Sequence, residues 1–565
     1  MTRRLFRTRP ATPALLLAAA LTAAACGSGS GKPAAAQAPA STQTSASGAP
    51  SSATTPSTAP TADQTSLERV IPEPVTVIRT GDVFTVTGAV MIRTSQGADQ
   101  IGADLAGYLK QDCGLTLAVS GGPGPAPAPG TILIDLAAAG AADAAVGDEG
   151  YQLDVTADSV TLRATSAAGL FHGVQTLRQL LTMKGTATGT EPGTSAAGTP
   201  ATLPTGHITD FPRYAYRGAM LDVARHFFSV GDVEKYIDAV ALYKVNTFHL
   251  HLTDDQGWRI AVPGRPRLTG VGGSTQVGGG PGGFYTAADF KAIVAYAAAR
   301  FMTVIPESDM PGHVGAAVAA YPDLACDGHP HALVTAVAPA FDSLCTSRES
   351  VYGYIDNVTG VLAGLTPGPY VGIGGDEASA LALPQYTGFV KRAQDIVAAH
   401  GKAVLGWAEM ANAPLLPNTV AEYWNTAAAQ PFAVAAARRG TKLVMAPGNH
   451  AYLDQKYDPS TALGLRWAGY VPVSKAYDWD PVTILPGVPP TSVLGVEAPL
   501  WTETVHSLRD AETLAFPRLP AIAEIGWSAP RTHDWASFSA RLGMQGPLWR
   551  TLAIAYYQAP EIPWK

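Results

Sequence analysis

Asp376 and Glu377 are adjacent carboxylates that follow two glycines in the segment 374–378, GGDEA. Carboxylates act as general acids, general bases or nucleophiles once their surroundings shift their pKa values. By itself the pair is weak evidence, because the chain has 45 acidic residues and a loop carboxylate is usually solvated or caps a helix. Its value as a candidate reaction centre therefore depends on the side chains that accompany it.

Further side chains suited to catalysis or ligand binding share one kind of position, directly after a short apolar segment. In chain order they are Arg225 and His226; Asp254 and Asp255; Glu307, Asp309 and His313; Trp407 and Glu409; Trp424; Tyr452 and Asp454; Trp501 and Glu503. Carboxylates accept hydrogen bonds from sugar hydroxyls, and indole faces cover the apolar C–H surface of a pyranose. The mixture of acidic residues and tryptophans favours a carbohydrate pocket.

A metal site is the rival interpretation, since Asp309 and His313, with Asp254 or Glu307, carry ligand-type side chains. The sequence has no HExxH pattern, and the tryptophans fit a sugar better than a hydrolytic metal centre. The glycine-rich segment 278–283 contains a proline and lacks the Lys-Ser/Thr of a phosphate-binding loop. We expect neither a metal nor a cofactor.

The apolar segments that precede these side chains predict strands. They cover residues 218–223, 247–252, 303–306, 370–373, 403–407, 420–424, 443–446 and 494–498. Amphipathic helical patterns lie between or after them, at 233–243, 287–300, 352–362, 387–400, 431–439 and 510–525. Eight such units predict a (β/α)8 TIM barrel over residues 208–565, with its active site at the C-terminal ends of the strands.

Residues 66–207 predict a small α+β domain ahead of the barrel. Short β-rich runs occur at 75–78, 83–86, 131–134, 151–155 and 160–164, and helical patterns at 99–110 and 169–181. The Gly/Thr/Ser/Pro-rich stretch 185–204 is typical of a surface loop or insertion.

The N-terminal segment predicts export. Arg3, Arg4 and Arg7 precede an apolar run at 14–25 that is too short to span a bilayer, so residues 1–26 are typical of a signal peptide. Cys26 at its end resembles the lipidation site of bacterial lipoproteins, which would attach the protein to the outer face of the cell membrane; simple secretion is the alternative. Residues 27–65 are Gly-, Ser-, Ala-, Thr- and Pro-rich and predict a disordered linker.

The remaining cysteines fit an oxidising compartment. Cys326 and Cys345 bracket a short loop and are expected to form a disulfide, while Cys113 is expected to be unpaired and buried.

Composition excludes some partners. The chain has 565 residues, 47% hydrophobic content, and 38 basic against 45 acidic residues, for a formal charge of −7. This balance offers no basic surface for a polyanion, so nucleic acid is not an expected partner. Oligomeric state does not follow from the sequence.

Several ordered motifs together resemble glycoside hydrolase family 20, the β-N-acetylhexosaminidases. The matching segments are 217–222 with 225–227, 249–259 (HLHLTDDQGWR), 277–283, 309–313 (DMPGH), 374–378, 406–407, 452–454 and 501–503. The likeness extends from about residue 66 to the C-terminus. It implies an exo-acting, retaining hydrolysis of terminal N-acetylhexosamine from β-glycosides such as chitooligosaccharides, in which the substrate's own acetamido oxygen attacks the anomeric carbon and forms an oxazolinium intermediate.

The resemblance also implies roles for individual residues. Glu377 would protonate the leaving oxygen and later activate water, with a raised pKa, and Asp376 would hold the acetamido N–H and stabilise the developing positive charge. Tyr452 would donate to the acetamido oxygen. The substrate-binding set is Arg225, Trp407, Trp424, Asp454, Trp501 and Glu503, and the supporting set is Asp254, Asp309 and His313.

Two positions depart from the family pattern, and two other functions stay open. Gly372 and Ser379 occur where relatives often have histidine, which bears on local support and on the aglycone side. The alternatives are a surface-tethered carbohydrate-binding lipoprotein without turnover, and a glycosidase of the same fold that releases a disaccharide. The sequence does not decide between N-acetylglucosamine and N-acetylgalactosamine.

Overall fold

The computed structural model describes residues 67–565 except 123–127, 138–145, 184–199, 340–341 and 428–429. The predicted signal peptide (1–26), the lipidation site Cys26 and the linker (27–65) lie outside the described residues. Among the described helices, none combines the length and apolar character needed to cross a membrane.

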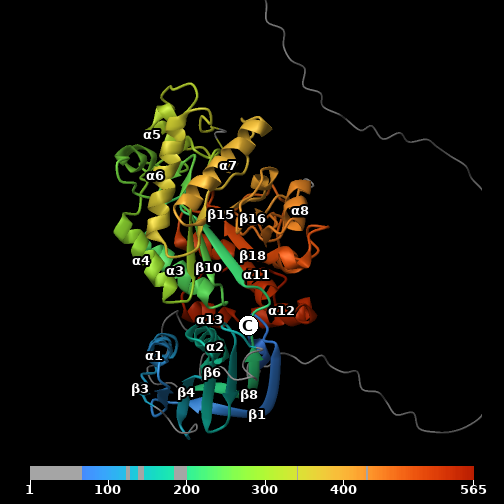
Figure 1. The fold of residues 1–565 in the computed structure, drawn as a ribbon. Helices are drawn as coiled ribbons and strands as arrows, with labels where there is room; N and C mark the ends of the chain where they lie inside the picture. Colours follow the sequence, from blue (N-terminus) through green and yellow to red (C-terminus); the bar gives the residue numbers. More distant parts are fainter. Residues whose placement is uncertain (1–66, 123–127, 138–145, 184–199, 340–341, 428–429) are drawn as a thin grey trace, which may run out of the picture. The chain divides into compact units, whose positions relative to one another are not determined.

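The small domain is an α+β unit, as predicted (Figure 1). Its sheet has the strand order β1-β8-β5-β6-β4-β2-β3, and β7 pairs with β8. The bounds are β1 Thr76–Val86, β2 Met91–Thr94, β3 Ala118–Gly121, β4 Thr131–Leu136, β5 Tyr151–Val155, β6 Ser159–Ala164, β7 Thr182–Met183 and β8 Ala201–Asp210, with helices α1 Asp99–Cys113 and α2 Ala167–Leu180. Strand β8 continues past residue 207, so the sheet of this domain ends at Asp210.

The second part of the chain is a closed barrel of parallel strands, which confirms the predicted TIM barrel. The barrel strands are β9 Tyr216–Asp222, β10 Thr247–His251, β13 Thr303–Glu307, β14 Tyr370–Gly372, β15 Ala403–Trp407, β16 Val420–Tyr423, β17 Lys442–Met445 and β18 Val493–Leu500. Two short strands, β11 Thr253–Asp254 and β12 Gly257–Trp258, pair with each other just after β10. Strands β9 and β10 are buried along their whole length, as expected for strands enclosed by helices on one face and by the barrel interior on the other.

Helices follow the barrel strands as the periodicity predicts (Figure 1). They are α3 Val230–Ala241, α4 Ala287–Ala298, α5 Gly315–Ala320, α6 Glu349–Leu365, α7 Leu383–Ala399, α8 Pro431–Arg438, α9 Val473–Tyr477, α10 Leu508–Ala515, α11 Arg518–Trp527, α12 Trp535–Gly543 and α13 Gly546–Thr551. The single helix expected at 510–525 is two helices, because Pro517 lacks an N–H donor and keeps the residue before it out of the helical region. After β13, a disulfide joins Cys326 to Cys345; Cys113 is free and buried.

Residues of the small domain bind the barrel through buried and partly buried charges. Lys244, which follows α3, lies 2.9 Å from Asp210 at the end of β8. Arg217 on β9 lies 2.6 Å from Glu149, which precedes β5. Tyr151 and Trp527 also donate hydrogen bonds to Asp210, at 2.7 and 2.8 Å. We call Tyr151, Asp210, Lys244 and Trp527 the junction cluster.

Candidate active site

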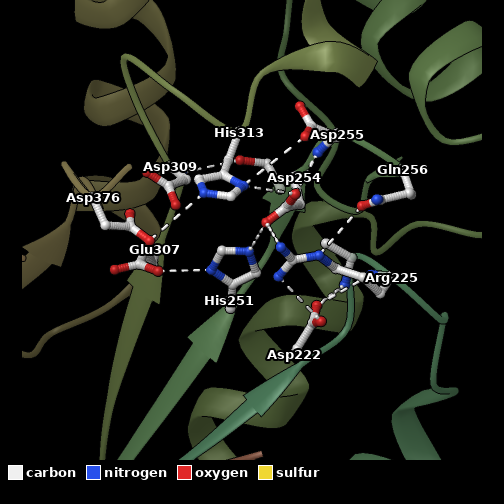
Figure 2. A network of polar contacts seen from close by, with 12 residues as sticks. Asp222, Arg225, His251, Asp254, Asp255, Gln256, Glu307, Asp309, His313 and Asp376 are labelled. Atoms are coloured by element: carbon white, nitrogen blue, oxygen red, sulfur yellow. Dashed lines mark hydrogen bonds and ion pairs between the residues drawn. The ribbon is translucent and has the colours of Figure 1, made fainter. Parts of the chain in front are cut away.

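The C-terminal ends of the barrel strands gather the side chains that the sequence singled out. Figure 2 shows Arg225 after β9, Asp254 after β10, His313 after β13 and Asp376 after β14 converging on one region. Arg225 Nη2 lies 2.8 Å from Asp254 Oδ2, and the guanidinium also covers the Trp501 ring at 4.9 Å. These contacts hold Arg225 against the wall of the site.

A left-handed turn at Gly374 and Gly375 positions the two adjacent carboxylates. Both glycines have positive φ, and a Cβ added at Gly374 would overlap the carboxylate of Asp309; only glycine allows that approach. Asp309 Oδ1 accepts a hydrogen bond from Gly375 N at 3.2 Å. Glu377 also has a positive φ of 45°, a conformation that side-chain-bearing residues adopt only when their surroundings impose it.

His313 connects the carboxylates to Asp254. Its Nδ1 lies 3.3 Å from Asp254 Oδ1, and its Nε2 lies 3.5 Å from Glu377 Oε2 and 3.7 Å from Asp376 Oδ2. Burial opposes a charged imidazole here, but the negative charges of Asp254 and Asp376 outweigh it and raise the pKa of His313 well above its ordinary value. An imidazolium therefore faces both carboxylates.

The pKa of Glu377 differs from the expectation. Hydrogen bonding to His313 holds the pKa of Glu377 below its ordinary value, whereas burial and then the charge of Glu377 raise the pKa of Asp376 to about 6 despite His313. The side chain of Glu377 is 44% exposed, so desolvation, which the expectation relied on, is the weaker influence. In the substrate-free protein below about pH 6, a proton therefore resides on Asp376 rather than on Glu377. Burial, and then the charge of Asp376, also raise the pKa of the neighbouring Asp309 well above its ordinary value.

Tryptophans and a tyrosine enclose the space beside the carboxylates. Trp407, Trp424, Tyr452 and Trp501 form one buried cluster with Met220 and Ala446. Trp407 and Trp501 have ring centroids 5.6 Å apart, and Trp424 stacks near-parallel to Tyr452 at 6.3 Å. Burial raises the pKa of Tyr452 well above 10, so its hydroxyl remains a hydrogen-bond donor at every physiological pH.

Four buried polar atoms of this pocket have no hydrogen-bond partner among the described residues. They are Asp376 Oδ1, Trp407 Nε1, Asp454 Oδ1 and Glu503 Oε2, which we call the unpaired pocket atoms. Burial, and then the charge of Glu503, raise the pKa of Asp454 to about 8. Since buried polar atoms are nearly always paired in folded proteins, this set indicates a pocket built for a ligand with several hydroxyl and amide groups.

A second feature lies next to Glu377 on the solvent side. A cavity of about 480 Å³ is lined by Glu377, Ala378, Ser379, Leu383, Glu409 and Trp424. Trp424 Nε1 donates to Glu409 Oε2 at 3.0 Å. Of the two departures from the family pattern, Ser379 therefore lies at this cavity, while Gly372 faces Glu307: a Cβ at Gly372 would lie 2.7 Å from the Cβ of Glu307.

Clusters of metal-type ligands do occur at the site. Potential ligand atoms of Asp309, His313 and Asp376 lie within 4.8 Å of one another, as do those of Asp254, Asp255 and His313. His313 also lies 3.3 Å from Asp254 and 3.7 Å from Asp376, so these side chains form a network of opposite charges.

Sequence reasoning missed two groups of residues. His249, Glu422 and Glu497 lie buried in the barrel interior together with His251 and Glu307; the alternation His249-Leu250-His251 was a signal, because alternate residues of a strand point to the same face. Trp467 is 50% exposed and makes T-shaped contacts with Trp424 and Tyr452, with ring centroids 5.8 and 5.5 Å away. A single tryptophan in a loop carries no comparable signal.

Comparison with known proteins agrees with this geometry. The model of the glycosyl hydrolase family 20 catalytic domain matches residues 214–386 and 380–530, and that of domain 2 of the family matches residues 68–211. A β-N-acetylhexosaminidase of Cellulomonas fimi is 44% identical over 422 residues, which cover 75% of this chain and 83% of that protein.

Solved structures show the same likeness. The family 20 β-N-acetylhexosaminidase of Streptomyces coelicolor A3(2) has a TM-score of 0.83 and 46% identity, covering 89% of this chain and 99% of that one. A mutant β-hexosaminidase of Streptomyces plicatus, solved in complex with the product GlcNAc, has a TM-score of 0.82 and 45% identity, covering 89% and 100%. Matches of this extent in sequence and fold, on a barrel that gathers the family's motifs at one end, show that the chain belongs to glycosyl hydrolase family 20 as a hydrolase of the β-N-acetylhexosaminidase type.

Proposed function

We propose that the protein releases single terminal N-acetylhexosamine units from β-glycosides, with retention of configuration and with the substrate's acetamido oxygen as the nucleophile. The unpaired pocket atoms carry this proposal, because they offer three acceptors and one donor inside an aromatic enclosure directly beside the Asp376–Glu377 pair. A sugar bearing hydroxyl groups and an amide supplies the complementary partners.

The position of the two carboxylates favours participation by the substrate. Asp376 and Glu377 are sequence neighbours that both face His313 Nε2, at 3.7 and 3.5 Å. A retaining scheme with an enzyme nucleophile needs carboxyl groups on opposite sides of the scissile bond, which this pair does not provide. One carboxyl then moves the proton and the other supports the substrate's amide.

Each residue has a defined task in this scheme. Glu377, the more exposed carboxyl, protonates the leaving oxygen and later takes a proton from water. Asp376 Oδ1 accepts the acetamido N–H, and its negative charge stabilises the oxazolinium cation. Tyr452 donates to the acetamido oxygen and holds it near the anomeric carbon. Arg225, Asp454 and Glu503 bind the hydroxyls, and Trp407, Trp424 and Trp501 enclose the ring.

The test compares aryl glycosides that differ only in the 2-substituent. An aryl N-acetyl-β-glucosaminide should be cleaved at least about 1,000-fold faster than the matching β-glucoside, since an intramolecular nucleophile gains a large proximity advantage. Mono-, di- and trifluoroacetamido substrates should react progressively more slowly, because fluorine withdraws electrons from the attacking oxygen. Equal rates across the fluorinated series would refute participation, and an inverted anomer in the first product, followed by NMR, would refute retention.

Chitooligosaccharides are the substrate class that we propose. The exposed Trp467 stands at the edge of the pocket, where a second sugar ring would stack on its face, and the Streptomyces plicatus relative was solved with GlcNAc. A panel of gluco and galacto aryl glycosides with chitobiose and longer oligomers tests this choice. Release of disaccharide from longer chains would instead favour the disaccharide-releasing alternative, and binding without release would favour the tethered binding protein.

We also propose that the protein is exported and held at the outer face of the cell membrane through Cys26. The N-terminal arginines, the apolar run and the small residues before Cys26 support this, as does the Cys326–Cys345 disulfide, a bond typical of oxidising compartments. Cell fractionation of the natural chain and a Cys26→Ala variant tests it. Recovery of the natural chain only in the medium would favour simple secretion.

A further inference from the structure

A buried imidazole–carboxylate pair lies behind the residues that bind Glu377. His251, on β10, has Nδ1 2.7 Å from Glu307 Oε1 and Nε2 2.9 Å from Asp254 Oδ2. Figure 2 shows the ring spanning the space between Glu307 and Asp254, with Arg225 on the other side of Asp254. Both ring nitrogens face carboxylate oxygens, which requires two N–H donors and therefore an imidazolium.

Further charged side chains extend this network into the barrel interior. Glu307 Oε2 lies 3.3 Å from Nε2 of His249, and Nδ1 of His249 lies 2.9 Å from Glu497 Oε1. Glu422 is 4.0 Å from the same Nδ1, and Tyr216 donates to the other oxygen of Glu497. All these side chains are buried.

At the inner end of this network, the protonation of Glu422 and His249 limits the net negative charge. Burial, and then the charge of Glu497, raise the pKa of Glu422 well above its usual range, so Glu422 stays neutral. Against burial, the charges of Glu307 and Glu497 raise the pKa of His249 well above 6.5. His249 therefore balances one carboxylate on each side.

Other groups that face His251 reinforce its charge. Asp222 on β9 adds a negative charge. Asp309 also lies close, with potential ligand atoms within 4.8 Å of those of His251 and Glu307, but burial and the charge of Asp376 raise its pKa well above the ordinary value and favour its neutral form. The edge of the Trp501 ring, after β18, covers the imidazole at a centroid distance of 4.8 Å. Although burial alone would favour the neutral ring, the hydrogen bonds to Asp254 and Glu307, together with the charges of Glu307 and Asp222, raise the pKa of His251 to about 9.

Toward the solvent, Asp254 transmits this arrangement to the catalytic carboxyl. Asp254 accepts from His251 and Arg225 through Oδ2 and from the backbone N of Asp255 through Oδ1, which lies 3.3 Å from His313. Since His313 Nε2 faces Glu377, alternating charges run without interruption from Glu497 in the barrel interior to the proton donor.

We propose that His251 and Glu307 are positioning residues for the reaction. They form an ion pair of zero net charge that holds Asp254 toward His313. The pair also sets the electrostatic potential that decides how a proton is distributed between Asp376 and Glu377. The pair touches neither substrate nor the reacting atoms. It acts through Asp254 and through its charges, and the inference rests on the proposed hydrolysis.

The experiment measures the pH profile of kcat/KM for the aryl N-acetyl-β-glucosaminide. For the natural chain, kcat/KM should fall as the pH rises through about 6, because the Asp376–Glu377 pair then loses its remaining proton. We call this fall the alkaline limb of the profile. His251→Gln removes a positive charge and should shift the alkaline limb to a pH about one unit higher.

Glu307→Gln should shift the alkaline limb to a pH about one unit lower. It removes a negative charge that raises the pKa of Asp376, while His251, still facing Asp254 and Asp222, stays charged at pH 6. The double variant restores the charge sum and should return the limb to within a few tenths of a unit of the natural position.

A matched control is His400→Gln, which breaks a surface histidine–carboxylate pair with Asp356 at 2.9 Å and should leave the profile unchanged. If His251→Gln and Glu307→Gln lower kcat without moving the limb, the pair is only structural and the proposal is wrong. Limbs that move in the same direction for both variants would overturn it as well.

A measurement on the natural chain covers the case in which a variant does not fold. Long-range ¹H–¹⁵N NMR at pH 7.5 should show His251, recognised by contacts with the Trp501 ring, with both ring nitrogens protonated; a neutral ring overturns the proposal. This measurement needs no turnover, so it separates failure of this inference from failure of the proposed hydrolysis.

Discussion

The junction cluster and the sugar pocket are both buried and polar, yet their atoms are satisfied in different ways. Asp210 in the junction accepts from Trp527 and the Val75 backbone through one oxygen, and from Tyr151 and Lys244 through the other. In the pocket, Asp376, Asp454 and Glu503 each keep a carboxylate oxygen without a partner among the described residues. Complete pairing is typical of a structural cluster, whereas unpaired atoms gathered beside Asp376 and Glu377 indicate a binding site.

The contrast has an energetic consequence. Removing one member of a fully paired buried cluster leaves its partner charged and unsatisfied, which is strongly destabilising. Removing a charge that already lacks a partner relieves a desolvation penalty instead. Junction substitutions should therefore reduce stability and spare turnover, whereas pocket substitutions should reduce turnover and spare or increase stability.

Glu377→Gln should give the largest loss of turnover. Because an amide cannot transfer the proton, we expect kcat to fall by roughly 100- to 10,000-fold, with the thermal midpoint almost unchanged since the side chain is partly exposed. Steady-state kinetics and thermal unfolding measure the two effects. Glu349→Gln, at an exposed carboxylate paired with Arg392, is the control; undiminished turnover in Glu377→Gln would remove that residue from the mechanism.

Lys244→Met should break the junction. It leaves Asp210 buried without its cation, so we expect the free energy of unfolding to fall by about 3–5 kcal/mol, while kcat per folded molecule stays the same. Urea unfolding with parallel activity assays measures this. Lys391→Met, which breaks a surface pair with Asp395 at 2.7 Å, should change the stability by less than about 1 kcal/mol, and an equal effect of both variants would contradict the contrast.

Asp454→Asn should show the opposite pattern. The pKa of Asp454 is raised to about 8 in the fold against about 4 in the unfolded chain, so the unfolded state releases its proton first and stability falls as the pH rises from about 4 to about 8. Asp454→Asn does not lose stability in this way, because an amide does not titrate. We expect it to gain stability relative to the natural chain as the pH rises from 5 to 8, and to lose about tenfold in kcat/KM; unfolding curves at both pH values test the sign.

The sequence predicted the parts of the molecule that local patterns specify. The eight strand positions followed from short apolar runs, whereas the single helix predicted at 510–525 was wrong, because Pro517 separates α10 from α11. The strand His249-Leu250-His251 was harder, because alternation normally indicates one face in water. In a closed barrel that face points into the interior, where Glu307 and Glu497 balance the histidines. The lowered pKa of Glu377 was beyond local reasoning, since its cause, His313, is 64 residues away in the chain.

Trp467→Ala should have the smallest effect on kcat/KM, and it tests whether the sugar pocket extends to Trp467. Trp467 meets Trp424 and Tyr452 in T-shaped contacts and leaves half of its surface exposed, so stability should change by less than about 1 kcal/mol. Its exposed part can stack on the second sugar of an oligomer but has no ring to contact in a substrate whose leaving group is methanol. We therefore expect kcat/KM for chitobiose to fall by about three- to tenfold, in line with an aromatic contact of about 0.5–1.5 kcal/mol, and kcat/KM for a methyl N-acetyl-β-glucosaminide to stay unchanged. An equal loss on both substrates would show that Trp467 instead braces Tyr452, and would extend the sugar pocket to the rim.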